Sequence, residues 1–573
     1  MHSSSTPGQD SEHIPTELVP SRAGNFGSLQ FSPSGHVRFV PQSSQWNSIL
    51  PRDGEGGHLE EVNDGPNDED AMFPFNGYGH LNKTELLALL PPRKYCDYLK
   101  KTYFKVFSPL FHILHDPTFE DEYERFQEDA SSVSLGWLAL LFIILGIAVT
   151  ALDDNDEILP DLGHEKSIST NIRVVSSRYR SAAMKCLAAD GVMTRHSMNS
   201  LQALVLTLYA RSHVNLPTWT LLGFTHHVAI AMGCHMDPSR FNLGVLECER
   251  RRRTWAGLMM IYTIQNTALG SFGHRPFSQD TKLPSDVNDI DLVAPSGKES
   301  PEGPTQMTYI LLKFRLYETS AKISETLLSS REGSPTTLAQ LENEVSFIQN
   351  MCASRYRSDS DRSYLPAYHM ANYNILQGYI HQLNLLIHRP NFTRCFQGDH
   401  SETLWRHRDK CIESAKSLLA IYRNLFECPI FAPYKWYTSG LASFHAFHAS
   451  VVLAAILMEP DSDYEYNEIK SLLLSSLGLF SALSHRSSVC DKAVTILQNL
   501  IDVANSRRCR VQSTTYASGA NGSSVAYSES ESPMASCHIE MMFSQLQPQN
   551  WLSPAAISWD GWDFLSRDDL AAS

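Results

Sequence analysis

Hydrophobic residues recur at helical spacing through the middle of the chain. Tyr95, Leu99, Tyr103 and Val106 stand at positions i, i+4, i+8 and i+11, which places them on one face of a helix. Similar patterns predict further helices at 199–209, 219–233, 249–269, 373–388, 408–425, 437–458 and 468–504, the last of which is long enough to contain a break. Because alternating strand patterns are few, we predict an all-α fold of antiparallel helices joined by loops of mixed length.

The two ends of the chain differ from this helical middle. Residues 1–75 are rich in Ser, Gly, Pro and Asp and lack helical periodicity, which is typical of disorder. Within them, residues 35–50 contain Val37, Phe39 and Trp46, which could dock as a short strand. We therefore divide the chain into a mostly disordered segment (1–75), a helical multi-helix body (76–510) and a flexible linker with an acidic, aromatic tail (511–573).

One apolar run, Leu135 to Leu152, has about the length of a membrane span. It stands alone, lacks basic flanks, and is followed by Asp153, Asp154 and Asp156. A helix that is apolar all round also suits the centre of a large helical protein. We predict a buried core helix and no membrane.

Charge and chemistry narrow the possible functions. The net charge of −15 argues against a large nucleic-acid surface, which would be basic. The eleven cysteines are scattered without a CxxC, which indicates reduced thiols in a cytosolic or nuclear compartment. Neither GxSxG, HExxH nor a phosphate-binding glycine loop occurs, so we expect no enzyme and no catalytic, cofactor-binding or metal residues. His445 and His448, at i and i+3, lack a nearby third ligand, and we interpret them as ordinary histidines.

The densest basic cluster is Arg250 to Arg253. It could be a localisation signal or contact phosphate. However, Glu247 and Glu249 precede it at the spacing of i, i+4 pairs with Arg251 and Arg253. We favour a structural role on a helix.

Several segments, in order, resemble the middle homology region of fungal zinc binuclear-cluster transcription factors. They are YFKVFSPLFHILHDPTF (103–119), NSLQALVLTLYARS (199–212), WTLLGFTHHVAIAMGCHMDPS (219–239), ECERRRRTW (247–255), GHRP (273–276), LPSDVNDIDL (283–292), LLIHRPNF (385–392) and CIESAKSLL (411–419). The residues that carry the signature are Trp219, Gly233, His235, Asp237, Glu249, Arg251, Arg252, Arg253, Trp255, Arg275 and Pro276. The chain departs from the family at Ala256, where a second Trp is usual, and at 262–265, where an Asp-Arg pair is missing.

The resemblance implies a nuclear regulator of transcription from a fungus. It also implies an unknown small-molecule effector, coactivator contacts and pairing, as a homodimer or heterodimer, with a zinc-cluster transcription factor. The family's six-cysteine zinc cluster is missing, since Cys96 is the first cysteine. We therefore expect no cofactor in this chain, zinc only if such a cluster precedes it, and contact with DNA only indirectly or through that module. Alternatives are a co-regulator without DNA contact, an unrecognised enzyme, or a small-molecule-binding protein.

The tail suggests a second functional element. Trp551, Trp559, Trp562 and Phe564 alternate with aspartates after a Ser-rich linker. Acids keep such aromatics solvated while leaving them free to dock on a partner. We predict a transactivation segment at 539–573; the alternative is that these aromatics fold back onto the helical body.

Overall fold

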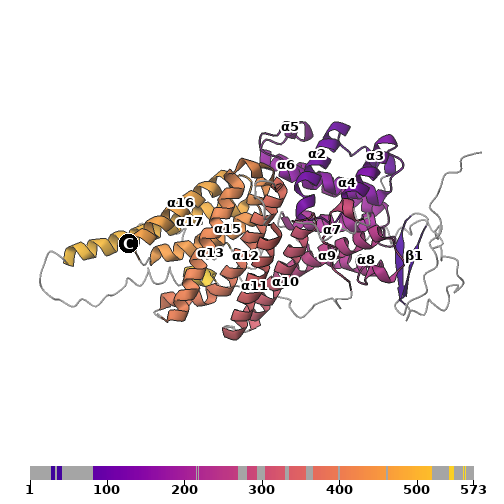
Figure 1. Ribbon diagram of the computed structural model, residues 1–573. Coiled ribbons are helices and arrows are strands. Elements are labelled where there is room, and N and C mark those ends of the chain that lie inside the picture. The colour runs from indigo at the N-terminus through magenta and orange to yellow at the C-terminus, as the bar shows by residue number, and fades with distance from the viewer. Residues whose placement is uncertain are drawn as a thin grey trace, which may run out of the picture.

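The computed structural model describes a helical protein with one small hairpin. The described residues are 27–32, 35–41, 82–213, 216, 218–268, 281–292, 303–329, 335–356, 365–397, 401–459, 462–518, 541–546, 551, 559 and 562. Helices of the N-terminal half gather at one end of an elongated molecule and those of the C-terminal half at the other (Figure 1). The fold class is therefore all-α, as the sequence predicts.

The N-terminal half is built around one apolar helix. Its helices are α1 (Lys83–Leu87), α2 (Arg93–Val106), α3 (Asp116–Glu128), α4 (Leu135–Ala148), α5 (Leu159–Leu162), α6 (Ile168–Ala189), α7 (Met198–His213), α8 (Trp219–Ala231) and α9 (Val245–Ala268). Helix α4 packs against α2, α6 and α7, and every residue from Gly136 to Ala148 is buried. The Ser134 hydroxyl caps its first turn by accepting from the Trp137 amide at 3.1 Å. The predicted core helix at this place is confirmed.

The C-terminal half pairs long helices side by side. They are α10 (Thr308–Ser329), α11 (Pro335–Tyr356), α12 (Ala367–Arg394), α13 (Glu402–Glu427), α14 (Lys435–Thr438), α15 (Leu441–Met458), α16 (Asp463–Leu483) and α17 (Ser488–Ser518). Helix α13 packs on α12 and α15, while α10 contacts α9, α11 and α12 and so joins the two halves. Among the described residues α15 is long and apolar enough to cross a membrane by length and composition, yet 94% of it is buried inside the protein, as in a core helix.

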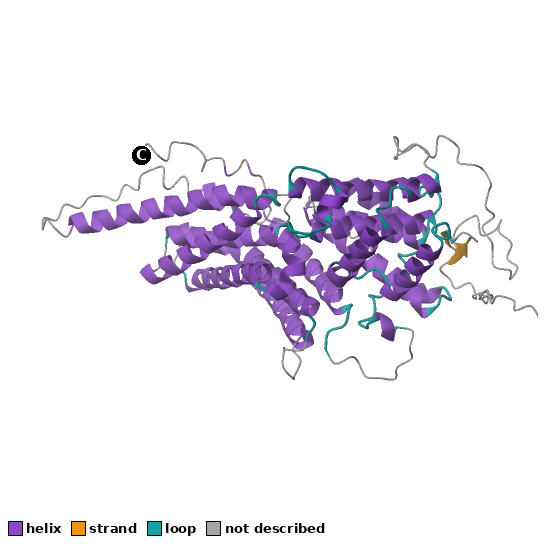
Figure 2. Cartoon of the chain, turned by 90° about the horizontal axis from the view of Figure 1, so that it is seen from above, coloured by secondary structure: helices purple, strands orange, loops and turns teal. Residues whose placement is uncertain are grey.

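The predicted break in the segment 468–504 is confirmed between α16 and α17. Helix α17 continues to Ser518 and extends beyond its neighbours in both views (Figures 1 and 2). The boundary at 510 was therefore placed too early, because residues 511–518 are helical rather than flexible linker.

A hairpin lies at the N-terminal end of the molecule (Figure 2). Strand β2 (Val37–Pro41) pairs antiparallel with β1 (Gly27–Phe31), with Leu29 opposite Phe39. Val37 is buried, and its amide donates to the His196 carbonyl at 2.7 Å. The strand predicted at Val37 and Phe39 is confirmed, the partner strand was not predicted, and Trp46 lies outside the described residues.

Candidate functional site

Two of the signature arginines, Arg251 and Arg253, are held inside the protein by carboxylates of their own helix. The Glu247 carboxylate accepts from Arg251 Nε at 2.9 Å, and that of Glu249 accepts from Arg253 Nε at 3.1 Å. These are the i, i+4 pairs that the sequence predicts. The Arg251 and Arg253 side chains are 1% and 0% exposed, so the cluster is not a basic surface patch. The structural interpretation of Arg250–Arg253 is supported over a phosphate contact.

Arg253 is also bonded to residues far away in the sequence. Its Nη1 donates to Asp289 Oδ1 at 2.6 Å and to the Leu114 carbonyl at 3.1 Å. Asp289, on the short 3-10 helix η5 (Asp289–Asp291), also pairs with His112 Nε2 at 3.0 Å and accepts from the Asp116 amide at 2.8 Å. Burial alone would raise the pKa of Asp289, but the hydrogen bond from His112 and the charges of His112 and Arg253 hold it well below its usual range.

A second ion pair fixes the loop between α8 and α9. The Arg252 guanidinium contacts both oxygens of Asp237, at 2.8 and 3.2 Å. Asp237 Oδ2 also accepts from the Lys282 amide at 2.9 Å. Burial would raise the pKa of Asp237, yet hydrogen bonds from Arg252 and Ser239 lower it well below its usual range. Residues 281–292 are thus held against α9 at two points. The Lys282 amide is linked through Asp237 to Arg252, and Asp289 is bonded directly to Arg253.

Other signature residues make packing contacts inside the protein. Trp255 is buried, with its ring 5.9 Å from that of His226, and burial together with nearby histidine charges lowers the pKa of His226 to about 4. Gly233 has a φ of +74°, and a Cβ there would lie 3.0 Å from Leu29 Cδ2, so glycine suits both its conformation and its close contact with the hairpin. The His235 ring meets Phe39 at 5.4 Å.

Three signature residues lie at the helix surface or outside the described residues. Trp219 is 43% exposed at the first residue of α8, with its ring 6.0 Å from that of Tyr262. At a helix end one side of the side chain has no further turn to pack against. Arg275 and Pro276 lie outside the described residues.

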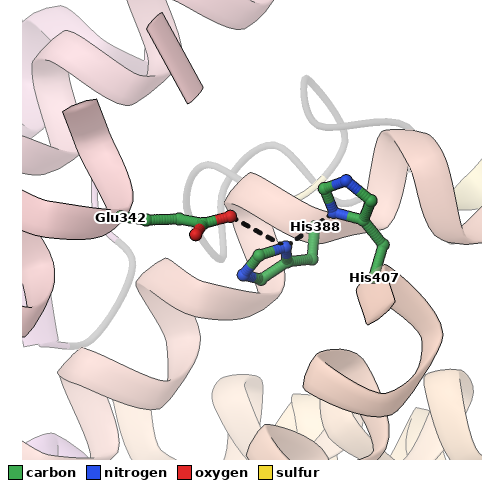
Figure 3. A group of neighbouring side chains, drawn as sticks. All are labelled: Glu342, His388 and His407. Atoms are coloured by element: carbon green, nitrogen blue, oxygen red, sulfur yellow. Dashed lines mark hydrogen bonds and ion pairs between the residues drawn. The ribbon is translucent and has the colours of Figure 1, made fainter. Parts of the chain in front are cut away.

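A cluster that sequence reasoning missed joins three helices. Figure 3 shows Glu342 of α11, His388 of α12 and His407 of α13 pointing toward one another. The two Nδ1 atoms are 2.8 Å apart, and the Glu342 carboxylate is 3.6 Å from His388. Burial lowers the pKa of His388 to about 3 and also lowers that of His407. Two neutral imidazoles and a carboxylate form a donor set that zinc accepts.

The same cluster is satisfied by hydrogen bonds alone. The Asn391 amide donates to His407 Nε2 at 3.2 Å, so His407 carries its proton on Nδ1 and donates it to His388. The Glu342 carboxylate pairs with the Arg406 guanidinium at 2.8 Å. We therefore interpret these residues as a polar contact between α11, α12 and α13. In the neighbouring group of His112, Asp116 and Asp289, the Asp289 carboxylate is likewise paired with Arg253.

The tail tryptophans lie against the helical body. Trp551 is 3% exposed, with its ring 3.5 Å from His448 and 4.0 Å from the Arg389 guanidinium. Trp559 and Trp562 meet the Phe447 ring at 5.6 and 5.8 Å. This is the folded-back arrangement that the sequence left open as an alternative to a free segment; Phe564 lies outside the described residues.

A cavity of about 20 Å³ opens between α12, α13 and α15, lined by Gly378, Tyr422 and His445 among others. That volume holds about one water molecule. It is too small for an organic effector without movement of its walls.

Part of the chain is similar to a known protein domain. Residues 101–352 match the fungal specific transcription factor domain. An uncharacterized transcriptional regulatory protein of Schizosaccharomyces pombe is 24% identical over 421 residues, which are 71% of this chain and 62% of that protein. A fusarisetin A cluster transcription factor of a Fusarium species is 24% identical over 485 residues, 79% of this chain and 62% of that protein. A Zn(2)-C6 fungal-type transcription factor of Monascus ruber is 28% identical over 297 residues, 49% of this chain and 34% of that protein.

The chain thus spans less than two thirds of the length of these relatives. A solved structure of the K. lactis CBF3 core aligns with a TM-score of 0.45 and 12% identity, over 89% of this chain and 96% of that one. That likeness is too low to support any conclusion about fold or partners.

Proposed function

We propose, from the premise that this chain carries a fungal specific transcription factor domain, that it regulates transcription in the nucleus of a fungus. The observation that carries the proposal is the match over residues 101–352, together with relatives whose names describe transcription factors. The ion pairs of Arg253 support the proposal. They join α9 to the segment around Asp289, which is a structural role for a signature residue and not a catalytic one.

Contact with DNA falls to another module or to a partner in this proposal. Arg251 and Arg253 are bound to carboxylates inside the protein, and Arg252 is bound to Asp237, so these three guanidinium groups are not available to phosphates. A zinc-cluster transcription factor paired with this chain would supply the DNA-reading element. A co-regulator without DNA contact of its own is the second candidate function, favoured by the same observation.

The segment 539–573 is proposed as the part that acts on the transcription machinery. Its tryptophans and aspartates give it the composition of a segment that docks on a coactivator. In the structure Trp551, Trp559 and Trp562 are instead packed on α12 and α15, so docking on a partner requires their release. Activation would then depend on the balance between these two positions.

Fusion of residues 539–573 to an unrelated DNA-binding domain tests this part of the proposal. We expect reporter output well above that of the DNA-binding domain alone, because the isolated segment has no helical body to cover its aromatics. Trp559→Ala combined with Trp562→Ala should lower that output about tenfold or more, since buried tryptophans dominate such contacts.

The matched control is Ser558→Ala with Ser566→Ala, which alters polar neighbours and should leave the output unchanged. A fusion that stays at background, or a double tryptophan variant as active as the unsubstituted segment, would leave the tail with a packing role only.

A further inference from the structure

Arg389 is a buried cation for which the described residues supply no hydrogen-bond acceptor. It lies in α12 before Pro390 and is 0% exposed, and none of its three guanidinium nitrogens finds a hydrogen-bond partner among the described residues. Arg253, equally buried, binds two carboxylates and a carbonyl. A buried charge whose donors are all unsatisfied is strongly unfavourable, so the surroundings of Arg389 are incomplete.

A second unsatisfied donor lies beside it. His448 of α15 is 1% exposed, and its Nδ1 accepts from Gln382 Nε2 at 3.0 Å. The remaining proton of the neutral ring is therefore on Nε2, which has no partner in the part of the chain that the structure describes. Arg389 and His448 thus both have N–H groups beside Trp551 that find no acceptor among the described residues.

Trp551 covers both donors with a flat ring. The indole lies 4.0 Å from the Arg389 guanidinium and 3.5 Å from the His448 ring, and its own Nε1–H donates to the Gln545 carbonyl. This geometry shows that the site accepts a planar aromatic group. The indole makes a cation–π contact with Arg389 but offers no oxygen atom to accept hydrogen bonds from Arg389 or His448.

A second buried basic side chain contacts α12 further along the helix. Lys313 of α10 is 4% exposed, and its ammonium group is surrounded by the rings of Tyr309, Tyr317 and Tyr379 at 5.2 to 5.7 Å. Burial lowers the pKa of Lys313 to about 7 and that of Arg389 to about 9, and no carboxylate among the described residues opposes either shift.

We propose that Arg389 and His448 form a binding site for a planar organic carboxylate, which takes the place of Trp551. The carboxylate oxygens accept hydrogen bonds from the guanidinium N–H groups of Arg389 and from His448 Nε2–H. The ring of the ligand occupies the space of the indole. Loss of the Trp551 contact weakens the attachment of the tail to α12 and α15. The consequence for transcription rests on the proposed function of residues 539–573, whereas ligand binding does not.

Calorimetry on the full chain tests the site with indole-3-carboxylate and its uncharged analogue indole-3-carboxamide. We expect the carboxylate to bind and the carboxamide to bind at least about tenfold more weakly, because only the carboxylate carries a charge opposite to that of the Arg389 guanidinium. Trp551→Ala should bind the carboxylate about tenfold more tightly, because it removes the competing indole.

Arg389→Gln should weaken carboxylate binding about tenfold or more, whereas Arg406→Gln, at an exposed arginine of α13, should leave it unchanged. The thermal midpoint of the ligand-free Arg389→Gln chain should equal or exceed that of the wild type, because an unpaired buried charge is removed. Equal binding of carboxylate and carboxamide, no gain in Trp551→Ala, or a lowered midpoint in Arg389→Gln would overturn the proposal. Since the assay involves no transcription, a silent tail fusion would leave its outcome unaffected.

Discussion

Replacement of Ile144 by aspartate should unfold the helical body. Ile144 is 0% exposed in α4, which is surrounded by α2, α6 and α7. A carboxylate there has no partner and no water, so the free energy of unfolding should fall by about 4 kcal/mol or more, a large part of the total stability of a typical domain. Urea denaturation, or the soluble fraction on expression, measures the loss.

The matched control is Ile168→Asp, the same substitution at a side chain that is 42% exposed. Ile168 is the first residue of α6, where an acidic group is tolerated or favoured. We expect its effect on stability to stay within about 0.5 kcal/mol. A soluble Ile144→Asp chain with wild-type stability would mean that α4 is not the core helix of this protein.

Arg253→Leu should cost about 3–5 kcal/mol of stability at neutral pH, because it strands two buried carboxylates. Glu249 and Asp289 are each 2% exposed and would lose their guanidinium partner. The control is Arg93→Leu, whose side chain is 71% exposed and 3.9 Å from Asp97, where we expect a change of less than about 1 kcal/mol.

The cost of Arg253→Leu should depend on pH. The pKa of Asp289 is depressed in the folded protein, so its stabilising contribution is present above the unfolded value of about 4 and is lost as the pH falls through the folded value. The difference in unfolding free energy between wild type and Arg253→Leu should therefore narrow as the pH is lowered from 7 toward about 3. A penalty that stays constant over this range would show that the lost interaction is packing and not charge.

The hydrophobic pattern predicts most of the long helices but not α6, α10 or α11, and for α6 polar residues in the core account for the omission. Helix α6 was missed, and its buried residues include Asn171 and Ser176. Asn171 donates to the Leu159 carbonyl at 3.0 Å, and Ser176 donates to that of Gly146 at 2.6 Å. Such side chains look solvent-facing in a sequence, because their partners come from tertiary structure.

The contacts of the candidate site could likewise be predicted only where both residues lie on one helix. The pair of Glu249 and Arg253 could be predicted because four residues of helix fix its geometry. Asp289 joins the same arginine from another segment, and Glu342, His388 and His407 come from three helices, so no local spacing reveals them. The place of Trp551 over Arg389 depends on how the tail folds back, which composition alone left open.

Recruitment of the full 573-residue chain to a promoter, through a fused unrelated DNA-binding domain, tests the regulatory function most directly. We expect reporter output to differ clearly from that of the DNA-binding domain alone. Output indistinguishable from the DNA-binding domain alone, at equal nuclear amounts of folded fusion protein, would contradict a role in transcription.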